Sequence, residues 1–157
     1  ETRGVPELQT AFSRFPAEVE RDMRQTMEVA TGMVHAEVVD RTPVGATGLA
    51  RRSMTTDIKG TGIDLTGRVF SRDEPVKIAS LETGRKPGKM PPIDPIALWV
   101  KRKFGGDRSA AFLVARAIGK RGTKGAKMFE RSYELTKPRV ERLFDQRIQA
   151  VITRVFR

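Results

Sequence analysis

The sequence predicts an α+β protein in which a long N-terminal amphipathic helix precedes a small antiparallel β-sheet and C-terminal helices. Two observations indicate this class. Apolar residues recur every three or four positions in the first and last parts of the chain, and they alternate with polar residues in a short stretch between these parts. A length of 157 residues suits one domain, or less often two small ones. We therefore expect a single domain over residues 1–157.

The first part of the chain predicts two helices. Residues 6–13 form a short helical segment that stops near Pro16, and Pro16 then suits the first turn of a long helix. That helix should end near Arg41, because Pro43 disfavours helical geometry in the residue before it. Its apolar face is marked by spacings of three and four residues. The residues of this stripe are Val19, Met23, Met27, Ala30, Val34 and Val38.

The next part predicts a turn followed by a β-hairpin. Residues 42–49, TPVGATGL, contain two glycines and a proline, as turns do. Residues 54–59 and 63–70 flank a Gly-Thr-Gly turn, and the second run alternates apolar and polar residues like a half-buried strand. The segment 76–82 is compatible with a third strand or with a short helix, because its periodicity does not decide between them.

The C-terminal half predicts further helices. Asp94 should cap one helix, and Ser109 should cap a second helix that continues to about Ile118. From residue 128 to the end the pattern is helical, and Pro138 should either kink this helix or begin a final one. The class is therefore α+β, with helices on both sides of the hairpin in sequence.

The positive charge is concentrated in one segment. The chain has 30 Lys and Arg against 19 Asp and Glu, a net charge of +11. Residues 84–131 contain thirteen basic and three acidic residues and are net +10, whereas residues 1–45 are net −3. Many basic loops simply face water, but such a concentration also favours contact with a phosphate backbone or with an acidic protein surface.

Two glycine-rich basic segments, 83–92 and 119–125, should be exposed loops. The second, GKRGTKG, superficially resembles a phosphate-binding loop, but it lacks the required spacing and follows a helix where that motif needs a strand. We expect the cations of both loops to contact DNA or neighbouring subunits. These candidate residues are Arg85, Lys86, Lys89, Lys120, Arg121 and Lys124.

The composition excludes several kinds of chemistry. The chain has no cysteine, which excludes disulfides, thiolate catalysis and cysteine-ligated metals, and it has a single histidine, His35. Its longest apolar run is six residues, against about 20 for a membrane span. Residues 1–10 lack the apolar core of a signal peptide, and the absent initiator methionine suggests a trimmed start. We expect no enzyme, no cofactor, no metal and no membrane partner.

Sequence-specific recognition of nucleic acid is not expected. Besides eight phenylalanines, only Trp99 and Tyr133 could stack on bases, and we expect Trp99 to be a packing anchor. The sequence contains no zinc-finger spacing and no aromatic strand of the RNA-binding type. Nonspecific binding to nucleic acid through the basic segments stays as the alternative function.

Several segments, taken in order, resemble a family of tail components of long-tailed bacteriophages, whose members are called tail-completion, minor tail Z-like or neck proteins. TPVGATGL and the following ARRSM are similar to the family's A-P-x-D-T-G-x-L-R-x-S-I, with Ala46 in place of the usual acidic residue. ASLETG, residues 79–84, is similar to its A-x-x-L/V-E-x-G-T segment. AFLVARAI at 111–118 resembles part of an insertion found in some members, and GT at 122–123 resembles the loop before the last helix.

The resemblance covers roughly residues 5–157 and implies a structural virion protein at the head–tail junction or the head-proximal end of the tail, present in the host cytoplasm during assembly. It implies a ring, most simply of six copies, that completes the tail and helps join it to the head. The expected partners are further copies of the chain, neck or connector proteins, tail-tube or tail-terminator proteins, and genomic DNA. A ring joins two different patches of neighbouring subunits, and the acidic N-terminal and basic middle segments offer such a pair.

Overall fold

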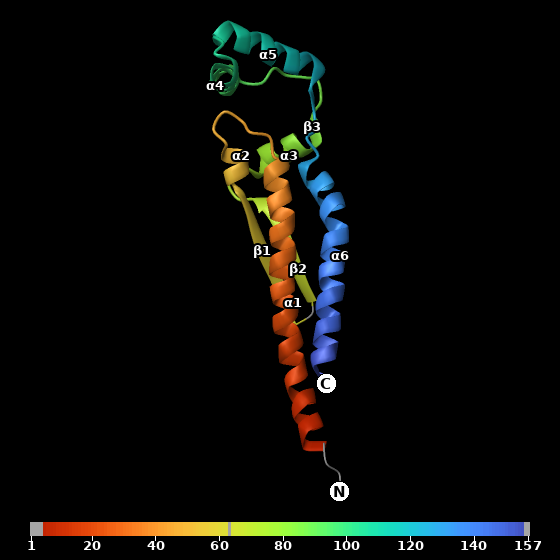
Figure 1. Ribbon diagram of the computed structural model, residues 1–157. Coiled ribbons are helices and arrows are strands. Elements are labelled where there is room, and N and C mark those ends of the chain that lie inside the picture. The colour runs from red at the N-terminus through yellow and green to blue at the C-terminus, as the bar shows by residue number, and fades with distance from the viewer. Residues whose placement is uncertain (1–4, 63, 156–157) are drawn as a thin grey trace. The chain divides into compact units, whose positions relative to one another are not determined.

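The computed structural model describes residues 5–62 and 64–155, and it describes the side chains of these residues from 17 to 154 (Figure 1). The predicted α+β class is confirmed. The described residues form helices and two separate two-stranded sheets. One sheet pairs β1 with β2, and the other pairs β3 with β4.

The chain divides into two compact units, each made of segments that are distant in sequence. Unit 1 comprises residues 1–37, 56–69 and 132–157. Unit 2 comprises residues 38–55 and 70–131. Unit 1 therefore contains most of the first and last helices and most of the β1–β2 hairpin, whereas unit 2 contains the shorter helices and the β3–β4 pair.

The first helix, α1, spans Val5–Arg41 and is continuous, so the predicted break near Pro16 is wrong. A proline removes one backbone hydrogen bond from a helix, and the bonds on either side of it can maintain the helix with a kink. The predicted apolar stripe is confirmed where side chains are described, with Met23, Ala30 and Val38 buried. The helix ends close to the predicted position.

The predicted hairpin is confirmed. Strand β1 spans Met54–Thr61 and β2 spans Asp64–Ser71, and the two strands are hydrogen-bonded neighbours. In unit 1, the turn between them is held against α1 at two points. The Arg24 guanidinium donates to the Gly60 carbonyl at 3.0 Å, and the Gly62 N–H donates to the Glu20 carboxylate at 3.1 Å.

The last helix, α6, spans Met128–Val155 and continues through Pro138, so no new helix begins at that proline. In unit 1 this helix is tied to α1 by an ion pair. Arg154 Nη2 lies 2.9 Å from Asp22 Oδ2, and the Asp22 side chain is only 7% exposed. Because a buried carboxylate is costly without a partner, this contact stabilises the pairing of the two helices.

Unit 2 is built from shorter elements. The segment 76–82, for which the sequence left a strand or a helix open, is part of helix α3. Helices α4 and α5 pack against each other. The elements are α2 (Leu49–Arg52), α3 (Pro75–Thr83), β3 (Gly84–Arg85), α4 (Ile93–Phe104), α5 (Arg108–Arg121) and β4 (Thr123–Lys124).

The predicted N-caps of α4 and α5 are both wrong. Helix α4 begins one residue before Asp94, whose carboxylate lies in the first turn and pairs with Arg108 at 2.9 Å. Helix α5 is capped by Asp107, which accepts the Ala110 N–H at 3.0 Å and the Ser109 hydroxyl at 2.7 Å. Acidic and hydroxyl residues are favourable both at the cap and in the first turn, so the sequence located each helix start only to within two residues.

The hydrogen bonds at the α5 cap also affect ionisation. The backbone N–H of Ala110, and after it the Ser109 hydroxyl, hold the pKa of the Asp107 carboxyl below its usual value of 3.8. Both contacts favour the charged form, because a carboxylate accepts hydrogen bonds more strongly than a protonated acid does.

The packing between α4 and α5 buries small side chains, namely Val100, Ala111 and Ala115. Elsewhere in unit 2, larger apolar residues are buried: Val38, Met54, Ile78 and Met128. Larger apolar residues of α4 and α5 remain exposed: Leu98 (41%), Phe104 (66%), Phe112 (43%) and Leu113 (62%). These exposed side chains leave apolar surface available for contacts outside the core of this unit. Covering that surface would be favourable, because apolar stabilisation scales with the area buried.

Candidate functional site

The two predicted basic loops are joined by a short antiparallel sheet within unit 2. In the β3–β4 pair, Gly84 lies opposite Lys124 and Arg85 lies opposite Thr123. The prediction of loop structure is therefore wrong at residues 84–85 and 123–124, which are strands. Strands of two residues carry no detectable periodicity, so sequence patterns could not have found them.

Two glycines allow the strands to approach. Gly84 has φ 81°, and a Cβ there would lie 2.3 Å from the Thr123 carbonyl oxygen. Gly122 has φ 71°, and a Cβ there would lie 2.0 Å from the Arg85 carbonyl oxygen. Both positions therefore require glycine, because an L side chain would combine an unfavourable backbone conformation with a clash against the opposing backbone.

The six predicted contact residues all lie on the joined segments, and all are exposed. They comprise Arg85 in β3, Lys86 and Lys89 in the loop after it, Lys120 and Arg121 in the last turn of α5, and Lys124 in β4. The expectation of a loop at 119–121 is wrong, because α5 extends beyond Ile118. Among the residues whose side chains are described, none of the six forms an ion pair.

Backbone contacts hold these cationic segments together. The Gly88 N–H donates to the Gly119 carbonyl at 2.8 Å, which ties the loop after β3 to the end of α5. Within the loop, the Arg85 guanidinium donates to the Lys89 carbonyl. The tertiary structure therefore converts two stretches that are separated in sequence into one basic surface.

Glu82 anchors this surface to the start of α6. One oxygen of its carboxylate accepts the Phe129 N–H and the other accepts the Glu130 N–H, both at 3.0 Å. Its carbonyl accepts the Lys127 N–H at 3.2 Å. A carboxylate at this position satisfies free helix amides and interacts favourably with the helix dipole. The segment 79–84, which carries part of the family resemblance, thus has a definite structural role.

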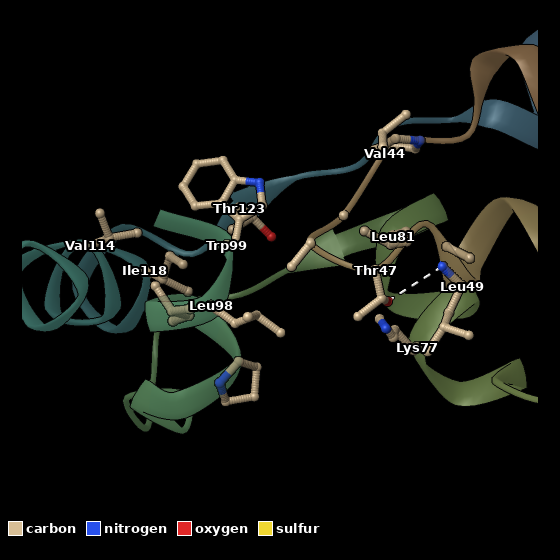
Figure 2. A pocket seen from close by; sticks show the side chains of 16 residues that line it. Val44, Thr47, Leu49, Lys77, Leu81, Leu98, Trp99, Val114, Ile118 and Thr123 are labelled. Atoms are coloured by element: carbon tan, nitrogen blue, oxygen red, sulfur yellow. Dashed lines mark hydrogen bonds between the residues drawn. The ribbon is translucent and has the colours of Figure 1, made fainter. Parts of the chain in front are cut away.

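An open apolar cavity of about 610 Å³ lies in unit 2 beside the basic surface (Figure 2). Its walls come from the turn at 43–47, from α2, α3, α4 and α5, and from β4. In Figure 2, Leu98, Trp99 and Ile118 lie on one side of the opening, and Val44, Thr47 and Leu81 lie on the other. The volume falls within the usual range of about 300–1,000 Å³ for clefts that bind small molecules or cofactors.

Positive charge borders this cavity. Lys77 is one of the lining residues, and its ammonium is paired with the Glu74 carboxylate at 2.8 Å. The Lys103 ammonium lies 5.4 Å from the centre of the Trp99 ring, which favours a cation–π contact. Trp99, expected as a packing anchor, packs edge-on against Phe104 with ring centres 5.3 Å apart and also lines the cavity. The cavity therefore combines an apolar interior with a cationic margin.

Sequence reasoning did not find the cavity, because its walls come from segments that are distant along the chain. One local signal was present. Val44 and Leu49 are large apolar residues in a turn-forming segment, and they remain 59% and 44% exposed. An apolar side chain in such a turn indicates a surface that is completed by other parts of the fold or by a partner.

Two other kinds of site are absent from the part of the chain that the structure describes. Within the described residues, no three or more His, Asp or Glu side chains are grouped so that they could hold a metal ion. The described helices also include none that is long and apolar enough to span a bilayer.

Comparison with known proteins yields no relative. No protein-family model matches the chain, and neither a curated protein nor a solved structure matches it.

Proposed function

We propose that this protein is a structural component of a bacteriophage virion, placed at the head–tail junction or the head-proximal end of the tail. In this role it assembles into a ring, most simply of six copies, that completes the tail and helps join it to the head. Its partners are other copies of itself, neck or connector proteins, and tail-tube or tail-terminator proteins. The segments that resemble the tail-completion family, and their order along the chain, support this proposal.

The distribution of charge between the two units carries the proposal. Unit 1 contains 12 basic and 12 acidic residues and is neutral, whereas unit 2 contains 18 basic and 7 acidic residues, net +11. The entire net charge of the chain therefore belongs to unit 2. A positive field of this kind repels copies of itself, and it favours a site next to a polyanion or an acidic protein.

Exposed apolar surface on the same unit favours a protein assembly. The large apolar side chains of α4 and α5 that remain exposed include Leu98, Phe104 and Leu113. Protein interfaces typically combine an apolar centre with a polar rim, whereas a surface that binds only nucleic acid is mainly cationic. Unit 2 has both features, as expected for a subunit that contacts protein neighbours close to DNA.

Reversing the charge of the basic surface tests this function. Replacing Lys86, Lys89, Lys120 and Lys124 together by Glu should block head–tail joining or DNA retention in a phage that depends on this protein. The measurement is the yield of infectious particles, together with electron microscopy of the heads and tails that accumulate.

A control variant carries the same change in net charge within unit 1. It replaces four exposed cations of that unit by Glu: Arg21, Lys59, Lys137 and Arg139. This control should assemble virions close to normal yield. Normal yield from the basic-surface variant would contradict the proposal, as would a virion whose connector region lacks this chain.

Nonspecific nucleic-acid binding is the second candidate, because six exposed cations lie on one joined surface without ion-pair partners among the described side chains. If this were the function, the isolated chain would bind random duplex DNA. Its affinity would fall with salt at a slope of about −0.9 per neutralised phosphate. A ring in native mass spectrometry, without appreciable duplex binding, would favour the structural role.

A further inference from the structure

The exposed face of α1 and the apolar cavity of unit 2 are complementary in chemistry and charge. We propose that the α1 face of one copy docks into the unit 2 cavity of a second copy. The inference rests on the proposed ring, since a ring requires two different patches on each subunit that meet between neighbours. It identifies both patches by residue.

The α1 face is an exposed apolar helix surface. Val29 is 45% exposed and Met33 is 38% exposed, and Gly32 and Ala36 beside them are also exposed. These residues follow the i, i+3, i+4, i+7 spacing that places side chains on one side of a helix. A Cβ at Gly32 would meet nothing within 4 Å, so this face is open to a close approach. Such a face is the typical partner of an apolar groove.

The charges of the two patches are opposite. Glu28 is the only Asp, Glu, Lys or Arg between residues 25 and 36, and it is exposed. At the cavity, Lys77 lines the opening but is paired with Glu74 at 2.8 Å, so the positive charge that remains beside the opening is Lys103 over Trp99, in a unit whose net charge is +11. Docking would therefore bring a weakly acidic apolar helix against a cationic apolar groove. Two cavities, or two α1 faces, would not complement each other in this way.

This contact is heterologous, and each copy that uses its cavity still presents its α1 face. Association can therefore continue from copy to copy and closes into a ring when the rotation between neighbours allows. The apolar interior supplies most of the association free energy, and the charges select the partner surface. Trp99, which lines the cavity, would lose contact with water when the next copy docks.

Crosslinking between two single-cysteine variants of the full chain tests the inference, because the chain has no cysteine of its own. Met33→Cys marks the α1 face, and Val114→Cys marks the cavity wall. One variant is isotopically labelled, the two are mixed, and a short bis-maleimide is added. Mass spectrometry should find the mixed dimer in about tenfold excess over either same-variant dimer, a difference of roughly 1.4 kcal/mol.

A neighbouring position supplies the matched control. Leu113 precedes Val114 on α5 and is 62% exposed, but it does not line the cavity. Met33→Cys mixed with Leu113→Cys should therefore give a statistical mixture of dimers. Equal yields from the Val114 and Leu113 mixtures would overturn the docking.

Trp99 fluorescence provides an independent readout, because it is the only tryptophan in the chain. Its emission should shift to shorter wavelength as the concentration of the wild-type chain rises, and Met33→Glu should abolish this shift. A Met33→Glu variant whose Trp99 emission shifts with concentration as in the wild type would also overturn the inference. If charge reversal at the four lysines still blocks virion assembly while crosslinking is unspecific, the proposed function stands and the docking fails. If crosslinking is specific but the variant with the four reversed lysines gives a normal virion yield, the docking stands and the proposed function fails.

Discussion

Unit 1 and unit 2 differ in net charge and in the residues that they bury. Unit 1 is electrically neutral, the Asp22–Arg154 ion pair joins α1 and α6 within it, and its buried apolar side chains include Met23, Ala30 and Val151. Unit 2 carries the whole net charge of +11 and, among the described side chains, buries more apolar residues, including Val38, Ile78 and Met128. The difference indicates that charge-dependent contacts with other molecules belong to unit 2, whose apolar core holds its cations in place.

The two units also depend on different kinds of contact. In unit 1, side chains at regular spacing bury an apolar stripe, and such contacts tolerate conservative replacement. In unit 2, the position of the basic surface depends on backbone geometry at glycines and on the carboxylate of Glu82. Single substitutions should therefore have sharply local effects in unit 2.

Gly122→Val should have the largest effect. A branched side chain at a positive φ, with its Cβ 2.0 Å from the Arg85 carbonyl oxygen, cannot be accommodated without separating β3 from β4. We expect a loss of about 2–4 kcal/mol in the free energy of unfolding. Urea denaturation measures the loss, and hydrogen exchange should show faster exchange at the β3 and β4 amides.

Gly88→Ala is the control for this prediction. Gly88 lies in the same basic segment, but a Cβ there would meet nothing within 4 Å and its φ is not positive. Its unfolding free energy should stay within about 0.5 kcal/mol of the wild type. Equal stability of both glycine variants would refute the account of the β3–β4 pair.

Arg154→Met should destabilise unit 1 by about 2–3 kcal/mol. The substitution keeps an apolar side chain but leaves the Asp22 carboxylate, 7% exposed, without its cation. The expected cost lies below that of a fully buried pair because Arg154 is itself 46% exposed. Chemical denaturation provides the measurement, with the exposed Arg139→Met on the same helix as a near-neutral control. A double variant with Asp22→Asn should recover part of the loss.

Glu82→Ala should cost about 1–2 kcal/mol, because the Phe129 and Glu130 amides at the start of α6 lose their acceptor. Thermal unfolding would detect this change. Glu74→Ala removes a carboxylate that makes a surface ion pair with Lys77 and should cost less than about 0.5 kcal/mol. A similar cost for both variants would show that Glu82 acts only as a surface charge.

Asp107 should produce the smallest effect, visible only in acid. Its pKa in the folded protein lies below the usual 3.8, so the unfolded chain takes up the proton first as the pH falls. The stabilisation is therefore fully present above about pH 3.8 and is lost as the pH falls through the lowered folded pKa. Melting temperatures between about pH 5 and pH 2 should show this loss, and Asp107→Asn should flatten it. The same acid dependence in Asp107→Asn would assign the effect to other carboxyls.

Long periodic elements were predictable from the sequence, and short or capped ones were not. The stripe from Met23 to Val38 predicted α1, and the alternation after Gly62 predicted β2. Sequence patterns did not predict that α1 continues through Pro16, that Asp107 caps α5, or that β3 and β4 form two-residue strands. Periodicity sums many weak preferences over many residues, whereas a cap or a two-residue strand depends on one or two contacts.

The sequence by itself determined the α+β class, the concentration of positive charge and the identity of the six exposed cations, because these follow from composition and local pattern. Only the tertiary structure decided that the two basic segments pair through Gly84 and Gly122, and that the turn at 43–47, α2, α3, α4 and α5 enclose a cavity beside Trp99. These features depend on backbone approach and packing between residues that are far apart along the chain, which local order does not specify.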